Sequence, residues 1–258
     1  MGKMGSFLVP VLLLADLVLF CVLNACGVRL ADAYPARFAF GADTSKYTVR
    51  GVDVSEYQGE IDWNVLAGQD LDFAYIKATK GSGYKDKKFK INWENAAKTD
   101  LEIGAYHLFA FDEPAQEQAE NFIGSVPDAY GLPPAVDVEL YGKDRDDPPD
   151  PEKTIPALAE FLEALEKRYC KKPVIYATKK AYQLYVQGHF RDNPLWIRDP
   201  DKEPTLPDGR GWTFWQHSNE GEMKGYGGES RFIDLNVFKG TEKEFADFIK
   251  YGIRSSLF

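Results

Sequence analysis

The chain of 258 residues is poor in cysteine, which limits how its fold can be stabilised. Two of its three cysteines, Cys21 and Cys26, lie in an apolar segment near the N-terminus, so Cys170 stands alone in the rest of the chain. No disulfide can therefore form within the body, and core packing must supply its stability. Because Cys170 precedes two lysines and has no histidine close by in the sequence, we interpret it as structural.

Histidine is also scarce, and acidic side chains outnumber basic ones by 40 to 31. The three histidines form no set with zinc-ligand spacing, and we expect His107 and His217 to be hydrogen-bonded residues of the barrel described below. No metal and no other cofactor is therefore predicted, although a hard cation held by Asp53 and Asp234 stays open as an alternative. The formal net charge of −9 leaves no basic stripe to neutralise phosphates, which argues against a nucleic-acid partner.

Apolar and aromatic side chains are plentiful. The chain is 44% hydrophobic and 14% aromatic, with five Trp and fourteen Tyr. This composition can bury a large core and gives no indication of disorder. The aromatic side chains suit the core of a barrel, and they equally suit stacking against sugar rings.

The N-terminus carries an apolar run from Phe7 to Cys26, long enough to cross a bilayer as a helix despite Asp16 at its centre. Three interpretations stay open. Residues 1–33 can be an uncleaved membrane anchor with membrane contact through residues 7–26, or a signal peptide cleaved after Ala33. Residues 23–26 also resemble a lipoprotein box. Each interpretation exports the rest of the protein, as an extracellular or cell-surface domain. Residues 34–50 are interpreted as a spacer and residues 51–258 as the catalytic domain.

Eight short apolar or β-rich runs follow the spacer, and most of them alternate with stretches of helical character. This alternation predicts an α/β fold with a parallel sheet: an irregular TIM-like barrel of eight strands with about five helices. The last three runs are joined by short Gly- and Pro-rich links, so we expect the final third to be irregular or antiparallel. A capping box at 241–244 predicts a terminal helix. The runs are 51–55, 73–78, 103–109, 134–140, 173–178, 194–198, 213–217 and 231–236.

Four carboxylates lie towards the ends of these runs. Asp137 and Glu139 are two residues apart on one run, so both point to the same face, about 6.6 Å apart at the backbone. Asp53 and Asp234 occupy similar places on the first and eighth runs, which are neighbours in a closed barrel. We therefore expect Asp53 and Asp234 to lie side by side, with the fourth strand facing them across the mouth.

The acid pair of the fourth run also has a structural interpretation. Asp137 and Glu139 can form ion pairs with Lys77 and Arg198, which lie on other strands of the series. Two acids inside an apolar run are costly to bury unless they are paired or used. The sequence alone therefore predicts acid chemistry or a structural ion-pair network at this point, with acid chemistry favoured. The acidic run 143–147 that follows is interpreted as a solvated loop.

Six segments, in order, resemble the glycoside hydrolase family 25 lysozymes, which are N-acetylmuramidases. The resemblance spans about residues 50 to 240, and the family's flattened barrel of eight strands agrees with the fold expected above. Lys80, Arg198 and His217 depart from residues that are frequent in the family. The six segments are 51–59, 73–81, 104–109, 132–139, 214–218 and 233–240.

The resemblance implies roles for the four acids. It makes Glu139 the general acid and gives Asp137 a supporting place at the reaction centre, with Asp53 and Asp234 completing the acidic site. It also implies that the substrate's own 2-acetamido group attacks C1. Substrate contacts are implied for Tyr57, Tyr106, Tyr176, Trp196, Trp215, Gln216 and Asn236.

The resemblance further implies a substrate, the glycan strands of peptidoglycan. The expected reaction is hydrolysis of the β-1,4 bond between N-acetylmuramic acid and N-acetylglucosamine by a monomeric enzyme. Two alternatives stay open: a wall-binding module that has lost catalysis, and a chitin-type N-acetylhexosaminide hydrolase with the same acid pair.

Overall fold

The structure, a computed structural model, describes residues 42–128 and 131–251. The apolar run at residues 7–26, with its predicted fates as an anchor, a signal peptide or a lipoprotein segment, lies outside the described residues. Within residues 42–128 and 131–251, no helix combines the length and the apolar character needed to cross a membrane.

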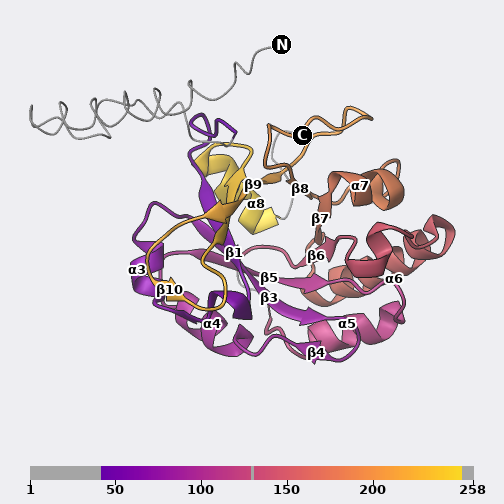
Figure 1. Cartoon of the computed structure of the whole chain (residues 1–258), viewed down its shortest axis with the longest axis horizontal. Coiled ribbons are helices and arrows are strands. Elements are labelled where there is room, and N and C mark those ends of the chain that lie inside the picture. Colours follow the sequence, from indigo (N-terminus) through magenta and orange to yellow (C-terminus); the bar gives the residue numbers. More distant parts are fainter. Residues whose placement is uncertain (1–41, 129–130, 252–258) are drawn as a thin grey trace, which may run out of the picture. The chain divides into compact units, whose positions relative to one another are not determined.

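Eight strands close into a barrel, as predicted (Figure 1). Closure comes from β1, which pairs with β3 on one side and with β11 on the other. In barrel order the strands are β1 (Arg50–Val54), β3 (Phe73–Lys80), β5 (Glu102–Leu108), β6 (Ala135–Val138), β7 (Val174–Thr178), β8 (Leu195–Arg198), β9 (Phe214–Gly221) and β11 (Ile233–Phe238). Three two-residue strands complete the sheets: β4 (Tyr84–Lys85) forms a hairpin with β3, and β2 (Glu60–Ile61) pairs with the distant β10 (Tyr226–Gly227).

Six α-helices are present in the described residues, where the sequence predicted about five. The longest, α6, has Asp150 as its N-cap and buries the apolar stripe that the sequence shows, and it packs beside α5. The helices are α3 (Trp63–Ala67), α4 (Phe89–Ala96), α5 (Ala115–Ile123), α6 (Pro151–Tyr169), α7 (Lys179–Ala181) and α8 (Glu242–Tyr251). Shorter turns are the 3₁₀-helices η1 (Glu56–Gln58) and η2 (Gly142–Arg145), and the π-helical η3 (Tyr182–Val186) that continues α7.

The final third of the barrel matches the sequence only in part. As expected, β11 runs antiparallel to both of its neighbours, β9 and β1. The expectation was wrong for β9, which pairs with β8 in parallel although no helix connects them. The loop 199–213 is long enough for this return, because β8 has four residues and each extended residue spans about 3.3 Å.

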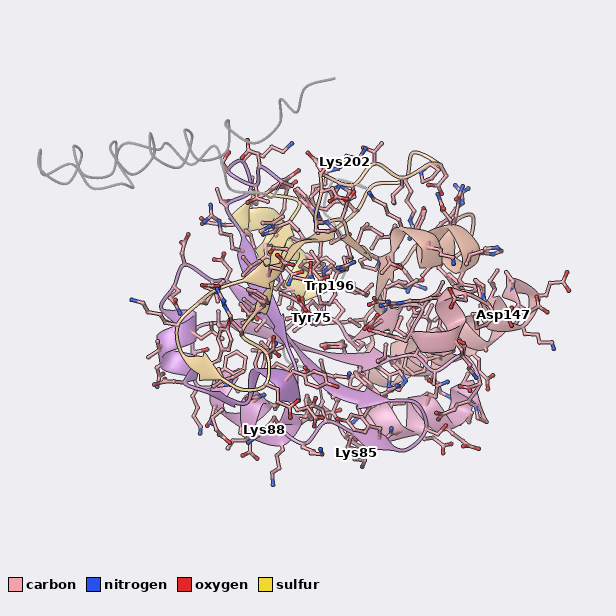
Figure 2. All side chains as sticks on the ribbon, viewed as in Figure 1. Tyr75, Lys85, Lys88, Asp147, Trp196 and Lys202 are labelled. Carbon is pink, nitrogen blue, oxygen red and sulfur yellow. The ribbon has the colours of Figure 1, made fainter. Side chains whose placement is uncertain are left out.

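Two apolar layers hold the barrel. The outer layer lies between the strands and the helices and includes Leu158, Phe161 and Leu165 of α6. The inner layer fills the barrel, where the Tyr75 and Trp196 rings stack with centroids 4.8 Å apart (Figure 2). Because side chains alternate along each strand, the strands other than β1 contribute to both layers, whereas β1 adds only Val52 and Val54 to the outer one.

The floor of the barrel is a group of five phenylalanines. Phe73 and Phe214 begin their strands and Phe238 ends the antiparallel β11, so all three lie at the same end. Helix α8 adds Phe245 and Phe248, whose rings lie 5.2–5.7 Å from those of Phe73, Phe214 and Phe238. The terminal helix therefore plugs one end of the barrel and leaves the other end open.

The predicted capping box opens α8. The Thr241 amide donates to the Glu244 carboxylate at 2.8 Å, and the Glu244 amide is 3.3 Å from the Thr241 hydroxyl. Both amides lie in the first turn, where the helix offers no backbone acceptor. This cap fixes the start of the helix that carries the floor.

Part of the stretch predicted to be a spacer belongs to the barrel. Tyr47 and Val49 are buried, and the Tyr47 ring packs edge-on against Trp212 at 5.4 Å. Its hydroxyl donates to Glu203 at 2.7 Å. The prediction of a spacer up to residue 50 was therefore wrong from at least Tyr47 onward, because a lone tyrosine and valine give no periodic pattern by which the sequence could reveal their burial.

Candidate active site

The four predicted acids meet at the open end of the barrel. The register of β1 and β11 pairs Asp53 directly with Asp234, as expected for the first and last strands. Asp137 lies in β6, and Glu139 follows the last residue of that strand. All four line a cavity of about 90 Å³, together with aromatic and amide side chains. Its lining is Asp53, Tyr106, Asp137, Glu139, Tyr141, Tyr176, Trp196, Gln216 and Asp234.

Asp234 reaches this mouth by a different route from the one predicted. The sequence placed it at the carboxyl end of a strand, but it is the second residue of β11. Because β11 is antiparallel to its neighbours, its amino end lies at the same rim as the carboxyl ends of the others. The position in space is therefore as expected, while the strand direction is reversed.

A hydrogen-bond network orients Asp53. Its Oδ2 accepts from Gln216 Nε2 at 2.9 Å and from Asn236 Nδ2 at 2.8 Å. The Tyr176 hydroxyl donates to Gln216 Oε1 at 2.9 Å, and Trp196 Nε1 donates to Asn236 Oδ1 at 2.8 Å. An indole nitrogen can only donate, so Trp196 fixes the Asn236 amide with its NH₂ towards Asp53. Both amides thus offer donors to one carboxylate oxygen.

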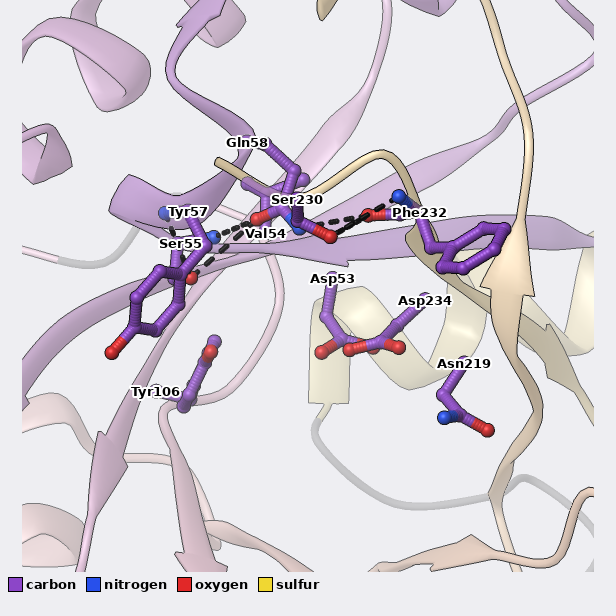
Figure 3. Close-up of a pocket in the computed structure, with 10 residues that line it drawn as sticks. All are labelled: Asp53, Val54, Ser55, Tyr57, Gln58, Tyr106, Asn219, Ser230, Phe232 and Asp234. Carbon is purple, nitrogen blue, oxygen red and sulfur yellow. Dashed lines mark hydrogen bonds between the residues drawn. The ribbon is translucent and has the colours of Figure 1, made fainter. Parts of the chain in front are cut away.

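Asp53 and Asp234 form a pair of carboxyl groups whose pKa values are both raised. Figure 3 shows their carboxyl groups pointing toward one another. Burial and the neighbouring Asp53 charge raise the pKa of Asp234 to about 9, and burial also raises the pKa of Asp53. Two close carboxylates in a buried site cannot both ionise without a large penalty. The amide donors of Gln216 and Asn236 oppose the rise in the pKa of Asp53, and the pair as a whole holds a proton above the usual pH range of a carboxyl group.

Asp137 and Glu139 differ in how they are held. One oxygen of Asp137, Oδ1, is buried and has no hydrogen-bond partner among the described residues. Burial and the Glu139 charge raise the pKa of Asp137 well above its ordinary value. Glu139 is less buried and accepts from the Tyr141 hydroxyl at 3.0 Å. Burial raises the pKa of Glu139 too, against the opposing effect of Tyr141 and nearby cations.

The alternative of a structural ion-pair network is not what the described residues form. Every ion pair within 4.0 Å found in them involves acids other than Asp137 and Glu139. Lys77 and Arg198 influence the two pKa values only at longer range. The pair therefore stays available to a ligand.

The predicted contact residues divide into three groups. Tyr106, Tyr176 and Trp196 line the acid cavity. A neighbouring cavity of about 220 Å³ shares Asp53, Tyr106 and Asp234 with it and adds Tyr57 (Figure 3). Gln216 lines the acid cavity, and it and the buried Asn236 donate hydrogen bonds to Asp53.

Trp215 was wrongly predicted to line the groove. In β9 the neighbouring residues Phe214 and Gln216 face the barrel interior, so Trp215 faces outward. It is fully buried against the outer layer, where its indole donates to the Asp199 carbonyl at 2.7 Å. The period-two alternation of a strand forbids Trp215 and Gln216 from sharing a face.

Tyr141 and Lys77 belong to the mouth but were not predicted as contacts. Tyr141 lines the acid cavity and continues the alternation of Asp137 and Glu139 beyond the strand, which is a signal the sequence carries. Lys77 acts electrostatically on Asp137 from β3. The sequence named Lys77 only as an alternative ion-pair partner of these acids, and the barrel brings it to the mouth without such an ion pair.

The histidines on strands are placed away from this chemistry. His107 is buried in the outer layer, with Nδ1 2.7 Å from Thr79 Oγ1 and Nε2 3.1 Å from Gln118 Oε1. Burial lowers the pKa of His107 to about 4, so it is neutral. His107 is thus a hydrogen-bonded barrel residue as predicted. His217 lies edge-on to Trp215, with ring centroids 5.7 Å apart, and burial lowers its pKa to about 4. In residues 42–128 and 131–251 no group of three or more His, Cys, Asp or Glu side chains is arranged to hold a metal ion.

A barrel whose mouth gathers carboxyl groups with raised pKa values beside aromatic side chains defines a site of the glycoside-hydrolase class. Residues 52–226 match the model of the glycosyl hydrolases family 25. The structure superposes on a family 25 glycosyl hydrolase from Bacillus anthracis with a TM-score of 0.78 and 46% identity, over 84% of this chain and 99% of that one. The chain belongs to glycoside hydrolase family 25.

Two further relatives carry the name lysozyme. Lysozyme M1 of Streptomyces globisporus is 33% identical over 217 residues, which cover 78% of this chain and 70% of that protein. The structure of the bacterial lysozyme from Streptomyces coelicolor has a TM-score of 0.71 and 28% identity, covering 80% of this chain and 98% of that one. The expected fold, a mixed barrel of eight strands, is therefore confirmed by independent structures.

Proposed function

We propose that this protein is a lysozyme that cleaves the β-1,4 bond between N-acetylmuramic acid and N-acetylglucosamine in peptidoglycan. The observation that carries the proposal is the mouth itself, where Asp137 and Glu139 of one strand face the Asp53–Asp234 pair in a single cavity. Family membership and the names of the relatives agree with this activity. The same acids would serve a chitin-type hydrolase, so the substrate is the point that experiment must decide.

Glu139 is assigned the role of general acid. Glu139 is more accessible than Asp137, and it also lines an adjoining cavity of about 300 Å³ that Tyr141 shares. Its raised pKa keeps a proton available for the leaving oxygen as the glycosidic bond breaks. The Tyr141 hydroxyl, which donates to Glu139, stabilises the carboxylate left after that transfer.

Asp137 is assigned to the substrate's 2-acetamido group. Asp137 lines the acid cavity and its buried Oδ1 has no partner among the described residues, and a carboxylate with a raised pKa is a strong hydrogen-bond acceptor. The acetamido oxygen attacks C1 as the leaving group departs with the Glu139 proton, and Asp137 accepts the acetamido N–H and stabilises the positive charge. Water then attacks C1 with Glu139 as base, which restores both groups.

The Asp53–Asp234 pair is assigned to positioning. The Asp53 and Asp234 carboxyls share a hydrogen bond, and Gln216 and Asn236 hold Oδ2 of Asp53, so the pair presents fixed polar atoms to the sugar. The Tyr106 and Trp196 rings provide apolar surface beside it. This arrangement orients a sugar ring before the bond breaks.

The site of action is proposed to be outside the cytoplasm. Peptidoglycan lies beyond the membrane, and the apolar run at residues 7–26 exports the domain as an anchor or as a cleaved signal. The enzyme is proposed to act there as a monomer. Intact-mass measurement on native protein from separated membrane and medium fractions distinguishes an anchor, a chain starting at Tyr34 and a lipid-modified Cys26.

Digestion of purified peptidoglycan tests the proposed activity. New reducing ends on N-acetylmuramic acid support it, and reducing ends on N-acetylglucosamine would assign a different bond. Binding without new reducing ends would identify a wall-binding module. Chitin oligosaccharides run in parallel test the chitin-type alternative, which predicts comparable rates on both substrates.

A further inference from the structure

The largest of the described cavities lies beside the acids, towards β3 and β4. It measures about 650 Å³, and no residue of the four-acid set lines it. It shares Tyr57 with the cavity of Figure 3, and it shares Lys80 and Tyr141 with the cavity that contains Glu139. The lining is Glu56, Tyr57, Lys77, Lys80, Gly83, Tyr84, Leu108, Glu113 and Tyr141. These shared walls make it an extension of the site rather than a separate pocket.

A β-bulge brings two lysines into this cavity. Lys77 of β3 pairs with Tyr106 of β5, but the next pair is Thr79 with His107, so Ala78 is an extra residue. In unbroken alternation Lys77 and Lys80 would face opposite sides of the sheet. The bulge restores Lys80 to the face of Lys77, opposite Leu108, and both lysines line the cavity. Bulges re-aim side chains in this way beside functional sites.

The charge of Lys80 is not neutralised by a close acid. No ion pair of Lys80 within 4.0 Å occurs in the described residues, and its side chain is exposed. The two acids of the cavity, Glu56 and Glu113, each accept a hydrogen bond from a backbone amide of a neighbouring segment. Glu113 accepts from the Ser82 amide at 2.5 Å, and Glu56 accepts from the Lys87 amide at 3.3 Å. Lys80 is therefore an exposed cation of the cavity wall that no carboxylate of the described residues contacts within 4.0 Å.

Three tyrosines give the same cavity a surface for sugar rings. Tyr57, Tyr84 and Tyr141 are 52%, 38% and 40% exposed, which is unusual for large aromatic side chains. Each lines the cavity. Tyrosine rings of this kind stack on the apolar faces of sugars and keep their hydroxyls for polar partners, as the Tyr141 hydroxyl does with Glu139. The combination of rings and an ammonium group fits a glycan that carries an acidic substituent.

We infer that the cavity around Lys77 and Lys80 is a subsite for a carboxylate carried on the glycan, with Lys80 as the residue that selects for it. The inference rests on the proposed lysozyme function, because it places the carboxylate on a sugar next to the bond cleaved at Glu139. Peptidoglycan offers two sources of that carboxylate: a free lactyl group and the acids of the stem peptide.

Binding of soluble glycan strands in the Glu139→Gln background tests the inference without turnover. Three forms are compared: native strands, strands whose carboxyls have been converted to amides, and strands stripped of their stem peptides. With Lys80 present we expect native strands to bind about fivefold more tightly than amidated strands, as for a partly exposed ion pair. Lys80→Met should remove this preference, and Lys80→Glu should reverse it.

Lys85→Met is the matched control. Lys85 lies in β4 on the same hairpin, is exposed, and does not line the cavity (Figure 2). This variant should keep the full preference for carboxylates, and the preference should weaken with added salt in every protein that shows it. Stripping the stem peptide frees the lactyl carboxyl, which is otherwise held in the amide bond to that peptide. If stripped strands bind as tightly as native strands, the free lactyl carboxylate fills the subsite; if they bind only as tightly as amidated strands, the acids of the stem peptide are the ligand.

Three outcomes overturn the inference. They are equal binding of native and amidated strands by the protein with Lys80, no binding of either form, and equal weakening of both by Lys80→Met. Failure of the proposed function is read in a separate measurement, as the absence of new reducing ends from the unsubstituted enzyme. The two failures are therefore distinguishable.

Discussion

The two ends of the barrel are built on the same strands and have opposite chemistry. β9 contributes Phe214 to the floor and Gln216 to the mouth, and β11 contributes Phe238 to the floor and Asp234 to the mouth. Two to four residues along one face therefore separate an apolar cluster from a carboxyl pair. The comparison shows how one scaffold keeps stability and chemistry apart.

The floor is stabilising because its five phenylalanines are removed from water with no polar atom among their side chains. The mouth is destabilising, because burying four carboxyl groups is costly, and their raised pKa values reflect that cost. A protein can maintain such a mouth only if the rest of the fold is stable enough to offset this cost. We expect substitutions at the floor to change stability and substitutions at the mouth to change chemistry.

The largest effect should come from Glu139→Gln. This change removes the proton donor and keeps the side chain's shape, so hydrolysis of purified peptidoglycan should fall about 10²- to 10⁴-fold while the Tm stays nearly unchanged. Counting new reducing ends and recording thermal unfolding of the same samples checks both halves. Glu163→Gln on the exposed face of α6 is the matched control, with full activity expected. Activity above a few per cent in Glu139→Gln would remove Glu139 from the acid role.

Asp137→Asn should lose a comparable share of activity for a different reason. An activated aryl glycoside has a good leaving group that needs little protonation, so Glu139→Gln should recover part of its rate on that substrate. Asp137→Asn should recover none, because its defect lies in stabilising the acetamido intermediate. Comparing the two variants on both substrates makes the distinction, and equal recovery would show that the two residues do not divide the work in this way.

Phe248→Ala should break the floor. Truncating a fully buried phenylalanine typically lowers the free energy of unfolding by about 3–5 kcal/mol. The protein that remains folded at low temperature should keep its activity, because the floor is at the far end of the barrel from the acids. Denaturant titration measures the loss, and Tyr251→Ala, an exposed truncation on the same helix, should cost little. A large loss of specific activity in folded Phe248→Ala would mean that the two ends are not independent.

Trp196→Phe should test the link between the two ends. The change keeps an aromatic ring and removes the donor that fixes the Asn236 amide, leaving a buried acceptor unpaired at a cost of about 1–3 kcal/mol. Asn236 can then turn its oxygen towards Asp53, so kcat should fall more than KM changes. Urea unfolding and steady-state kinetics give the two numbers. Unchanged kinetics would show that Asp53 does not depend on this amide.

Per pH unit, the pH dependence of stability should give the smallest change in the free energy of unfolding. The pKa of Asp234 rises from 3.8 to about 9 on folding, so between these values the folded state binds the proton more strongly than the unfolded state. This contribution is fully present below about pH 4 and is lost as pH rises towards 9, with a slope of up to about 1.4 kcal/mol per pH unit. Asp234→Asn should flatten the slope of Tm between pH 5 and 8 and raise the Tm at pH 8. An unchanged slope would assign the proton to another group.

The sequence alone predicted the eight strands, most helices and the meeting of four acids. The predictions of strands and helices succeed because they depend on local signals: β-rich apolar runs, the α6 stripe and the Thr241 capping box. The side-by-side placement of Asp53 and Asp234 follows from barrel closure once the strands are counted. The roles implied for the four acids stay predictions until the variants above are measured.

Only the tertiary structure decided which face each contact residue occupies. Trp215 and Gln216 are adjacent in sequence, and the register of β9 sends one to the outer layer and the other to Asp53. The reversed direction of β11 and the bulge that turns Lys80 into the large cavity have no local signature either. Local propensity fixes where strands form, whereas direction, register and bulges depend on partners far along the chain.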